Sequence, residues 1–149
     1  MRIEDEIKQK RFQSPQHKLN VNLIYTHNWL QDKMQGVFKP FKITAQQYNI
    51  LRILRGQYPN PCTIQLLKDR MLDKQSDVSR LIDRLTQKGH VDRKICEADR
   101  RKMDVVISEK GLQLLKDLDG HVTIIVDTMQ NLTLDEIDQL NTLLDKLRG

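Results

Sequence analysis

The sequence predicts a mainly α-helical protein that carries one small β-hairpin near residue 100. Apolar residues recur every three or four positions through most of the 149 residues, which is the spacing of amphipathic helices. Two β-prone runs, HVDRKI at 90–95 and MDVVI at 103–107, depart from that spacing. Residues that cap helix N-termini precede most of the helical segments. A chain of this length is expected to form a single domain, 1–149.

The first half of the chain predicts a short polar helix and then two longer helices. After the short helix in the first dozen residues, residues 15–38 form a long amphipathic helix with Leu19 and Leu23 on its apolar side. His27 fills the one gap in that apolar stripe. Thr44 and Gln47 then fit a capping box, which starts a helix that must end before Pro59.

The middle of the chain predicts two further helices in close succession. Thr63 is placed to cap a helix of about two turns. Asp73 is placed to cap the next helix, of about 15 residues, whose apolar residues fall at i, i+3, i+4 and i+7 from Val78. Gly89 is well placed to end that helix in the left-handed conformation.

The β-prone runs 90–95 and 103–107 predict a hairpin with a charged tip, and two helices complete the chain. Ser108 caps a long helix, and Thr133 with Glu136 forms a capping box for the last one. The expected order is therefore helix, helix, short helix, helix, hairpin, helix, helix.

Positive charge is concentrated in one segment of the chain. Residues 74–102 contain nine Lys or Arg and five Asp or Glu, so they supply +4 of the total formal charge of +5. Such a concentration is typical of a protein that binds a polyanion, although a basic surface without a partner explains the charge alone equally well.

The two helices that Thr63 and Asp73 cap form a helix-turn-helix candidate. On the second of them the apolar residues share one side. Hydroxyl, amide and charged groups occupy the other: Ser76, Arg80, Asp83 and Gln87, flanked by Asp77, Ser79 and Arg84. Such groups match base edges and phosphates. Taken in isolation, the helix fits an ordinary amphipathic surface helix better.

The hairpin that follows favours the DNA-binding interpretation. Its tip carries Asp99, Arg100, Arg101 and Lys102, and an Arg at a thin tip fits the narrow, negative minor groove. Helix and hairpin together make a winged helix-turn-helix. Asp77 and Asp83 count against DNA, because phosphates repel an unpaired carboxylate. They orient neighbouring Arg side chains or read cytosine amino groups.

The segment SDVSRLIDRLTQKGHVDRKICEADRRKMDVVISEKG resembles the signature of the MarR family of winged-helix transcriptional regulators, and ITAQQYNILRIL resembles that family's second helix. The resemblance implies a DNA-binding region at 40–108 and a helical dimerisation region at 1–39 and 109–149. It implies a homodimer that reads a palindromic operator in double-stranded DNA. In that complex Ser76, Asp77, Ser79, Arg80 and Arg84 face the major groove, Arg101 enters the minor groove and Asp99 orients it.

The first and last long helices are expected to form the dimer. Their apolar residues would otherwise leave a sizeable exposed patch. The residues assigned to this contact are Leu19, Leu23, Ile137, Leu140, Leu144 and Leu147.

The family resemblance also implies a small aromatic effector that binds between the dimer region and the winged region. His27, Asn28, Trp29 and Tyr48 are the candidates for that site, although helix spacing does not place all of them on one side. A histidine that is satisfied in the core or in an interface is the more common explanation for His27.

Other classes of function find little support. The four histidines and two cysteines show no metal-ligand spacing and the glycines form no phosphate-binding loop, so no enzyme, metal or cofactor is expected. No membrane helix and no signal segment are expected, and the few cysteines favour the reducing cytoplasm. The prediction is a homodimeric transcriptional repressor that a small molecule releases from DNA. The alternative is a winged-helix module that binds an acidic protein partner.

Overall fold

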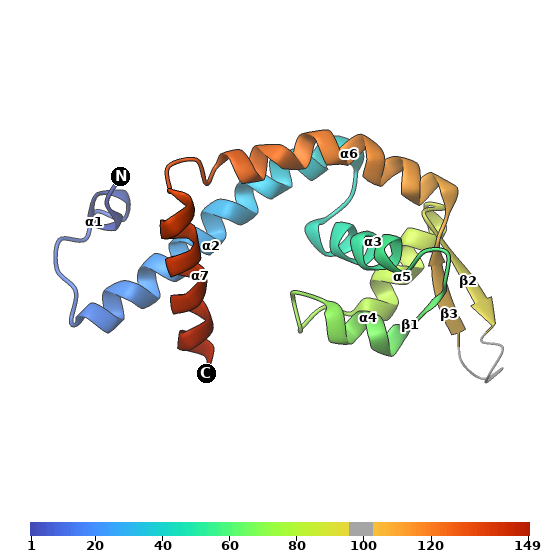
Figure 1. Ribbon diagram of the computed structural model, residues 1–149, viewed down its shortest axis with the longest axis horizontal. Helices are drawn as coiled ribbons and strands as arrows, with labels where there is room; N and C mark the ends of the chain where they lie inside the picture. The colour runs from blue at the N-terminus through green and yellow to red at the C-terminus, as the bar shows by residue number, and fades with distance from the viewer. Residues whose placement is uncertain (96–102) are drawn as a thin grey trace.

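The computed structural model describes residues 1–95 and 103–149, and it has the predicted fold class, mainly helical with a small sheet (Figure 1). The elements in chain order are α1 (Ile3–Glu6), α2 (Pro15–Phe38), the 3-10 helix η1 (Lys39–Phe41), α3 (Ala45–Gln57), β1 (Cys62–Thr63), α4 (Ile64–Arg70), α5 (Val78–Gln87), β2 (Val91–Ile95), β3 (Met103–Ile107), α6 (Glu109–Asp127) and α7 (Leu134–Arg148).

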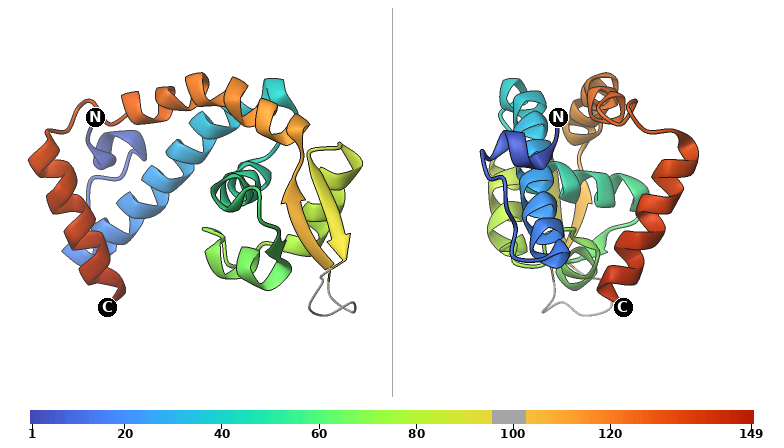
Figure 2. Two further views of the ribbon diagram at one scale, coloured as in Figure 1. Left: turned by 45° about the vertical axis from the view of Figure 1, so that its right-hand side comes forward. Right: turned by 90° about the vertical axis from the view of Figure 1, so that its left-hand side faces the viewer.

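The molecule is elongated, with two ends of different construction. Helices α3, α4 and α5 gather with the small sheet at one end, which we call the winged end (Figures 1 and 2). Helix α6 leaves the sheet and runs beside the second half of α2 toward the opposite end. Helices α1 and α7 and both termini lie there, at what we call the terminal end.

The winged end contains the main hydrophobic core. Ile50 and Leu54 of α3, Ile82 and Leu85 of α5, and Leu115 of α6 are all at most 1% exposed. This core forms because each of these helices has a continuous apolar side that faces the others and the sheet. It holds α5 by one side and leaves the opposite side in solvent.

Local sequence signals set most of the helix starts as predicted. Thr44 and Thr133 each form a complete capping box, and the Thr63 hydroxyl accepts a hydrogen bond from the backbone N–H of Leu66. The Ser108 hydroxyl accepts one from the N–H of Gly111 in the first turn of α6. Gly89 ends α5 with φ of +74°, a conformation that glycine adopts without strain.

At the winged end the predicted hairpin is present with one further strand beside it, and the predicted length and N-cap of one helix are wrong. The sheet has three strands in the order β1-β3-β2, because Cys62 and Thr63 pair with Val105 and Asp104. Helix α5 has 10 residues rather than about 15, and Asp77, not Asp73, is its N-cap. Asp73 instead closes the turn before the helix.

That turn explains the later start of α5. The Asp73 carboxylate accepts hydrogen bonds of 3.0 Å from the backbone N–H of Gln75 and from the Ser76 hydroxyl. Both bonds lower the pKa of Asp73 below its ordinary value, and the bond from the Gln75 N–H has the larger effect. A short acidic side chain that accepts hydrogen bonds from the residues two and three positions after it favours a turn over a helix. Ser76 therefore lies before α5, not within it.

Within residues 1–95 and 103–149, no helix combines the length and the apolar character that crossing a bilayer requires. The same residues contain no group of three or more His, Cys, Asp or Glu side chains arranged to hold a metal ion.

Candidate nucleic-acid interface

The exposed side of α5 is the centre of the candidate interface. Val78, Ile82 and Leu85 are buried and fix the helix on the winged end. Ser79, Arg80 and Arg84 are exposed, and Ser76 is half-buried just ahead of the helix. The predicted separation of an apolar and a hydrogen-bonding side is therefore present in the fold.

The two carboxylates on this helix have structural partners. The Asp77 carboxylate accepts a hydrogen bond of 3.1 Å from the backbone N–H of Arg80, which satisfies one of the free amides in the first turn. Asp83 forms an ion pair with Arg93 of β2. Asp77 thus stabilises the start of α5 and Asp83 joins this helix to β2, which accounts for acidic residues on an otherwise basic face.

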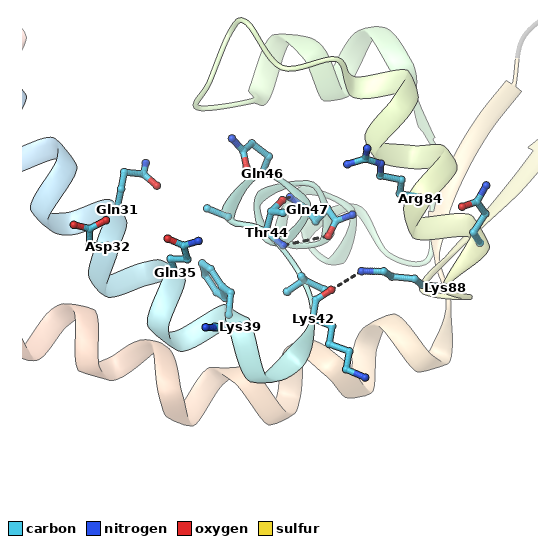
Figure 3. Close-up of a pocket in the computed structure, with 14 residues that line it drawn as sticks. Gln31, Asp32, Gln35, Lys39, Lys42, Thr44, Gln46, Gln47, Arg84 and Lys88 are labelled. Atoms are coloured by element: carbon cyan, nitrogen blue, oxygen red, sulfur yellow. Dashed lines mark hydrogen bonds between the residues drawn. The ribbon is translucent and has the colours of Figure 1, made fainter.

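Arg84 lies beside a groove between α5, the start of α3 and the end of α2. Figure 3 shows its guanidinium extending from α5 toward the segment that carries Thr44 and Gln46. The groove has a volume of about 620 Å³. Lys88, the residue that follows α5, donates a hydrogen bond to the backbone carbonyl of Lys42 (Figure 3). The Arg84 backbone carbonyl accepts a hydrogen bond from the Lys88 N–H. Its guanidinium has no hydrogen bond or ion pair with any other described residue, so its donors are available to a ligand.

The hairpin follows directly after α5. β2 and β3 pair antiparallel, from Val91 opposite Ile107 to Ile95 opposite Met103. Arg93 and Lys94 are exposed on β2 and extend the basic surface beyond the helix. The predicted tip residues Asp99, Arg100, Arg101 and Lys102 lie outside the described residues.

His90 joins α5 to the hairpin and is 8% exposed. Its Nδ1 atom has no hydrogen-bond partner among the described residues. Burial, and then the nearby Lys110 and Lys88 ammonium groups, lower the pKa of His90 below its ordinary value. These effects favour the neutral imidazole over the charged one at the base of the hairpin.

A second groove, of about 820 Å³, lies between α2, α3 and the turn before α5. His27 and Tyr48 line it, whereas Asn28 and Trp29 do not, because positions 28 and 29 are rotated about 100° and 200° away from position 27 on the helix. Trp29 is exposed, with the Lys33 ammonium 4.8 Å from its ring centre.

Sequence reasoning missed Arg52 in this second groove. Its guanidinium donates a hydrogen bond of 3.0 Å to the Tyr48 hydroxyl and lies over the Tyr48 ring. The spacing of four residues on a helix was the signal that could have found it. Met34 and Met71 also line this groove and add apolar, adaptable surface.

The residues assigned to a dimer contact lie at the terminal end. Leu19, Leu140 and Leu147 are each about half exposed, while Leu23, Ile137 and Leu144 are partly covered. No residue of α7, all of which the structure describes, is buried. The apolar side of α7 is therefore present but only partly covered within one chain.

A helix-turn-helix joined to a β-hairpin, with a basic outward helix face, defines a winged-helix protein. Residues 43–103 match the MarR family. A MarR transcription factor from Planctomyces limnophilus is 33% identical, with 91% of this chain and 98% of that chain covered and a TM-score of 0.70. The chain therefore belongs to the MarR family and is a MarR-family transcriptional regulator.

Two further solved structures share the fold. A mutant of MarR from E. coli, complexed with operator DNA, is 23% identical, with 99% of each chain covered and a TM-score of 0.80. BpsR from Bordetella bronchiseptica, solved in a study of how 6-hydroxynicotinic acid regulates its DNA binding, is 21% identical. For BpsR, 93% of this chain and 99% of that chain are covered, and the TM-score is 0.81.

Proposed function

We propose that this regulator binds a palindromic operator as a homodimer, with α5 in the major groove and the hairpin tip in the minor groove. The observation that carries the proposal is the exposed basic side of α5, which the core holds from behind. The similar E. coli protein was solved with operator DNA, which supports the same role for this chain.

In this proposal residues 40–108 are the DNA-binding region, and residues 1–39 and 109–149 form the dimerisation region. Ser76, Ser79, Arg80 and Arg84 contact DNA, while Asp77 acts mainly by capping the helix that presents them. Arg101 enters the minor groove with Asp99 as its orienting partner, and Arg100 and Lys102 bind phosphates. Two recognition helices would lie about one DNA turn, roughly 34–36 Å, apart.

We propose further that the chain is a repressor that a small aromatic effector releases from DNA. The groove that His27, Tyr48 and Arg52 line is the proposed effector site, because it combines a cation, an aromatic ring and methionine side chains. An effector that prefers a dimer with different spacing between its recognition helices would lower operator affinity by its differential binding energy.

Selection from random duplex DNA tests the DNA-binding proposal. An enriched palindrome, bound with an affinity that falls steeply as salt rises, is the expected result, because cations on α5 and β2 would displace counterions. The alternative, a module that binds an acidic protein, predicts that no palindrome is enriched.

Arg80→Ala tests the role of the helix face. If Arg80 donates two hydrogen bonds to a guanine, the substitution should cost about 1–3 kcal/mol of binding free energy and relax selectivity at that base pair. Binding to operators with single base changes, followed by fluorescence anisotropy, measures both effects. Lys116→Ala, which removes an exposed positive charge from α6, is the control. Reduced affinity with unchanged selectivity would assign Arg80 to a phosphate instead.

A further inference from the structure

The end of the recognition helix is fastened to the first turn of α6. Three successive backbone carbonyls just after α5 each accept a hydrogen bond from the start of α6. The Lys110 ammonium donates to the carbonyl of Lys88 at 2.7 Å, and the Ser108 hydroxyl donates to that of Gly89 at 2.7 Å. The Ser108 N–H donates to the carbonyl of His90 at 3.1 Å. We call residues 88–90 and 108–111 the α5–α6 junction.

The Ser108 hydroxyl connects both sides of this junction. It donates to the Gly89 carbonyl and accepts from the Gly111 N–H at 3.1 Å, so one oxygen caps α6 and holds the end of α5. The carbonyls of residues 88–90 follow the last turn of α5, so no N–H group of that helix bonds them. The start of α6 supplies their donors instead, and the positions of the two helix ends become dependent on each other.

Gly111 brings the two backbones into direct contact. A Cβ atom at this position would lie 2.3 Å from the His90 carbonyl oxygen and 2.7 Å from Cγ1 of Ile107. The first of these is a backbone atom, so an added methyl group would force the segments apart. The absence of a side chain at Gly111 therefore sets how closely the start of α6 approaches the end of the recognition helix.

Helix α6 continues from this junction to the terminal end (Figure 1). Further along, Asp119 accepts two hydrogen bonds from the Arg55 guanidinium of α3, at 2.8 and 3.1 Å. The winged end is thus attached to α6 at two separated points, and α6 connects it to the helices of the proposed dimer contact.

We infer that Ser108, Lys110 and Gly111 are positioning residues that fix the angle of α5 on α6, and thereby select the spacing between operator half-sites. The inference rests on the proposed function as a DNA-binding dimer. Because α6 connects each recognition helix to the dimer region, a change of angle at the junction alters the distance between the two recognition helices. A purely structural junction would change stability and leave the preferred spacing unaltered.

The test uses the full chain and a series of operators whose half-sites are moved one or two base pairs closer together or further apart. Each added base pair rotates and shifts one half-site, since one turn contains about 10–10.5 base pairs. Fluorescence anisotropy gives the affinity for each spacing. Wild-type protein should prefer one spacing.

Gly111→Ala is the main variant, and Gly120→Ala is its control on the same helix. Position 120 has no atom within 4 Å of an added Cβ, so both variants gain the same helix propensity and differ in the contact with His90. Gly111→Ala should change the affinity ratio between neighbouring spacings by more than about fivefold. Gly120→Ala should keep that ratio within about twofold of the wild-type value.

Lys110→Met provides a second variant that removes the ammonium and keeps the side-chain length. Lys110→Met should reduce the difference in affinity between operator spacings. Lys110→Arg, which keeps a donor and a positive charge, should show the wild-type preference. Lys116→Met, at an exposed position of the same helix, should have no effect. If Gly111→Ala fails to fold, the spacing preference of Lys110→Met tests the inference in its place. If the wild-type chain prefers one spacing and the junction variants keep that preference, the inference about the junction is wrong and the proposed function stands. A wild-type chain that prefers no spacing overturns the proposed function and the inference with it.

Discussion

The winged end and the terminal end use the same kind of amphipathic helix with opposite results. At the winged end, Leu54, Ile82 and Leu115 are at most 1% exposed, so one chain completes the core there. At the terminal end, Leu143 and Leu147 of α7 remain 63% and 56% exposed. One end is finished within the chain, whereas the other presents apolar surface of the kind that a second chain covers. The contrast supports the proposed homodimer.

The largest effect is expected from charge placed on the apolar side of α7. Leu140→Glu combined with Leu147→Glu should raise the dimer dissociation constant at least about 100-fold, since an unpaired buried charge costs about 3–5 kcal/mol. Sedimentation equilibrium measures it. Thr142→Glu, on the opposite side of α7, should leave the dimer intact. A double variant that stays dimeric would move the interface away from α7.

A large-to-small substitution in the core of the winged end should lower the stability of the fold instead. Ile82→Ala removes a side chain that is 0% exposed and should lower the free energy of unfolding by about 2–5 kcal/mol, because it leaves a cavity behind α5. Urea unfolding measures this change. Leu143→Ala is the control at the terminal end, and in the monomeric background its effect should be far smaller. Equal losses at both positions would contradict the contrast between the two ends.

A smaller effect is expected from the cap of the recognition helix. Asp77→Ala should destabilise the winged end by about 1 kcal/mol, because it removes the acceptor for the Arg80 N–H. Thermal unfolding measures it. Asp77→Asn keeps a capping oxygen and removes the charge, so it should retain stability. If both variants lose stability equally, the carboxylate charge rather than the cap is what matters.

The smallest effect should come from His90, and it appears only at acid pH. Its pKa is lowered in the fold, so below pH about 6.5 the unfolded chain binds more protons than the folded one. Stability should fall as pH drops from 6.5 through the folded pKa, and this loss should shrink in His90→Gln. Urea unfolding at pH 7.5 and pH 5.5 measures the difference.

The sequence predicted best those features that neighbouring residues determine. The caps at Thr44, Thr63, Ser108 and Thr133 and the stop at Gly89 depend on groups within a few positions, and all are present. The fold class and the order of the longer elements followed from apolar spacing for the same reason.

The features that sequence reasoning missed depend on distant or competing contacts. Strand β1 is two residues long and exists because it pairs with β3 more than forty positions later. Asp73 and Asp77 are both good capping residues, and the turn that Asp73 closes with Gln75 and Ser76 decides between them. The Asp83–Arg93 pair likewise joins a helix to a strand, which spacing on either element alone does not reveal.

The strand order β1-β3-β2 leaves β2 on the edge of the described sheet, next to the proposed DNA-binding surface. A strand edge with free N–H and C=O groups is a template for pairing with another chain. Asp92, Arg93, Lys94 and Ile95 are all exposed on it, so three charged side chains in succession oppose such pairing. Arg93 and Lys94, which are suited to bind phosphates, therefore also oppose pairing of this edge with another chain. Variants that neutralise them to weaken DNA binding should self-associate through β2 at high concentration.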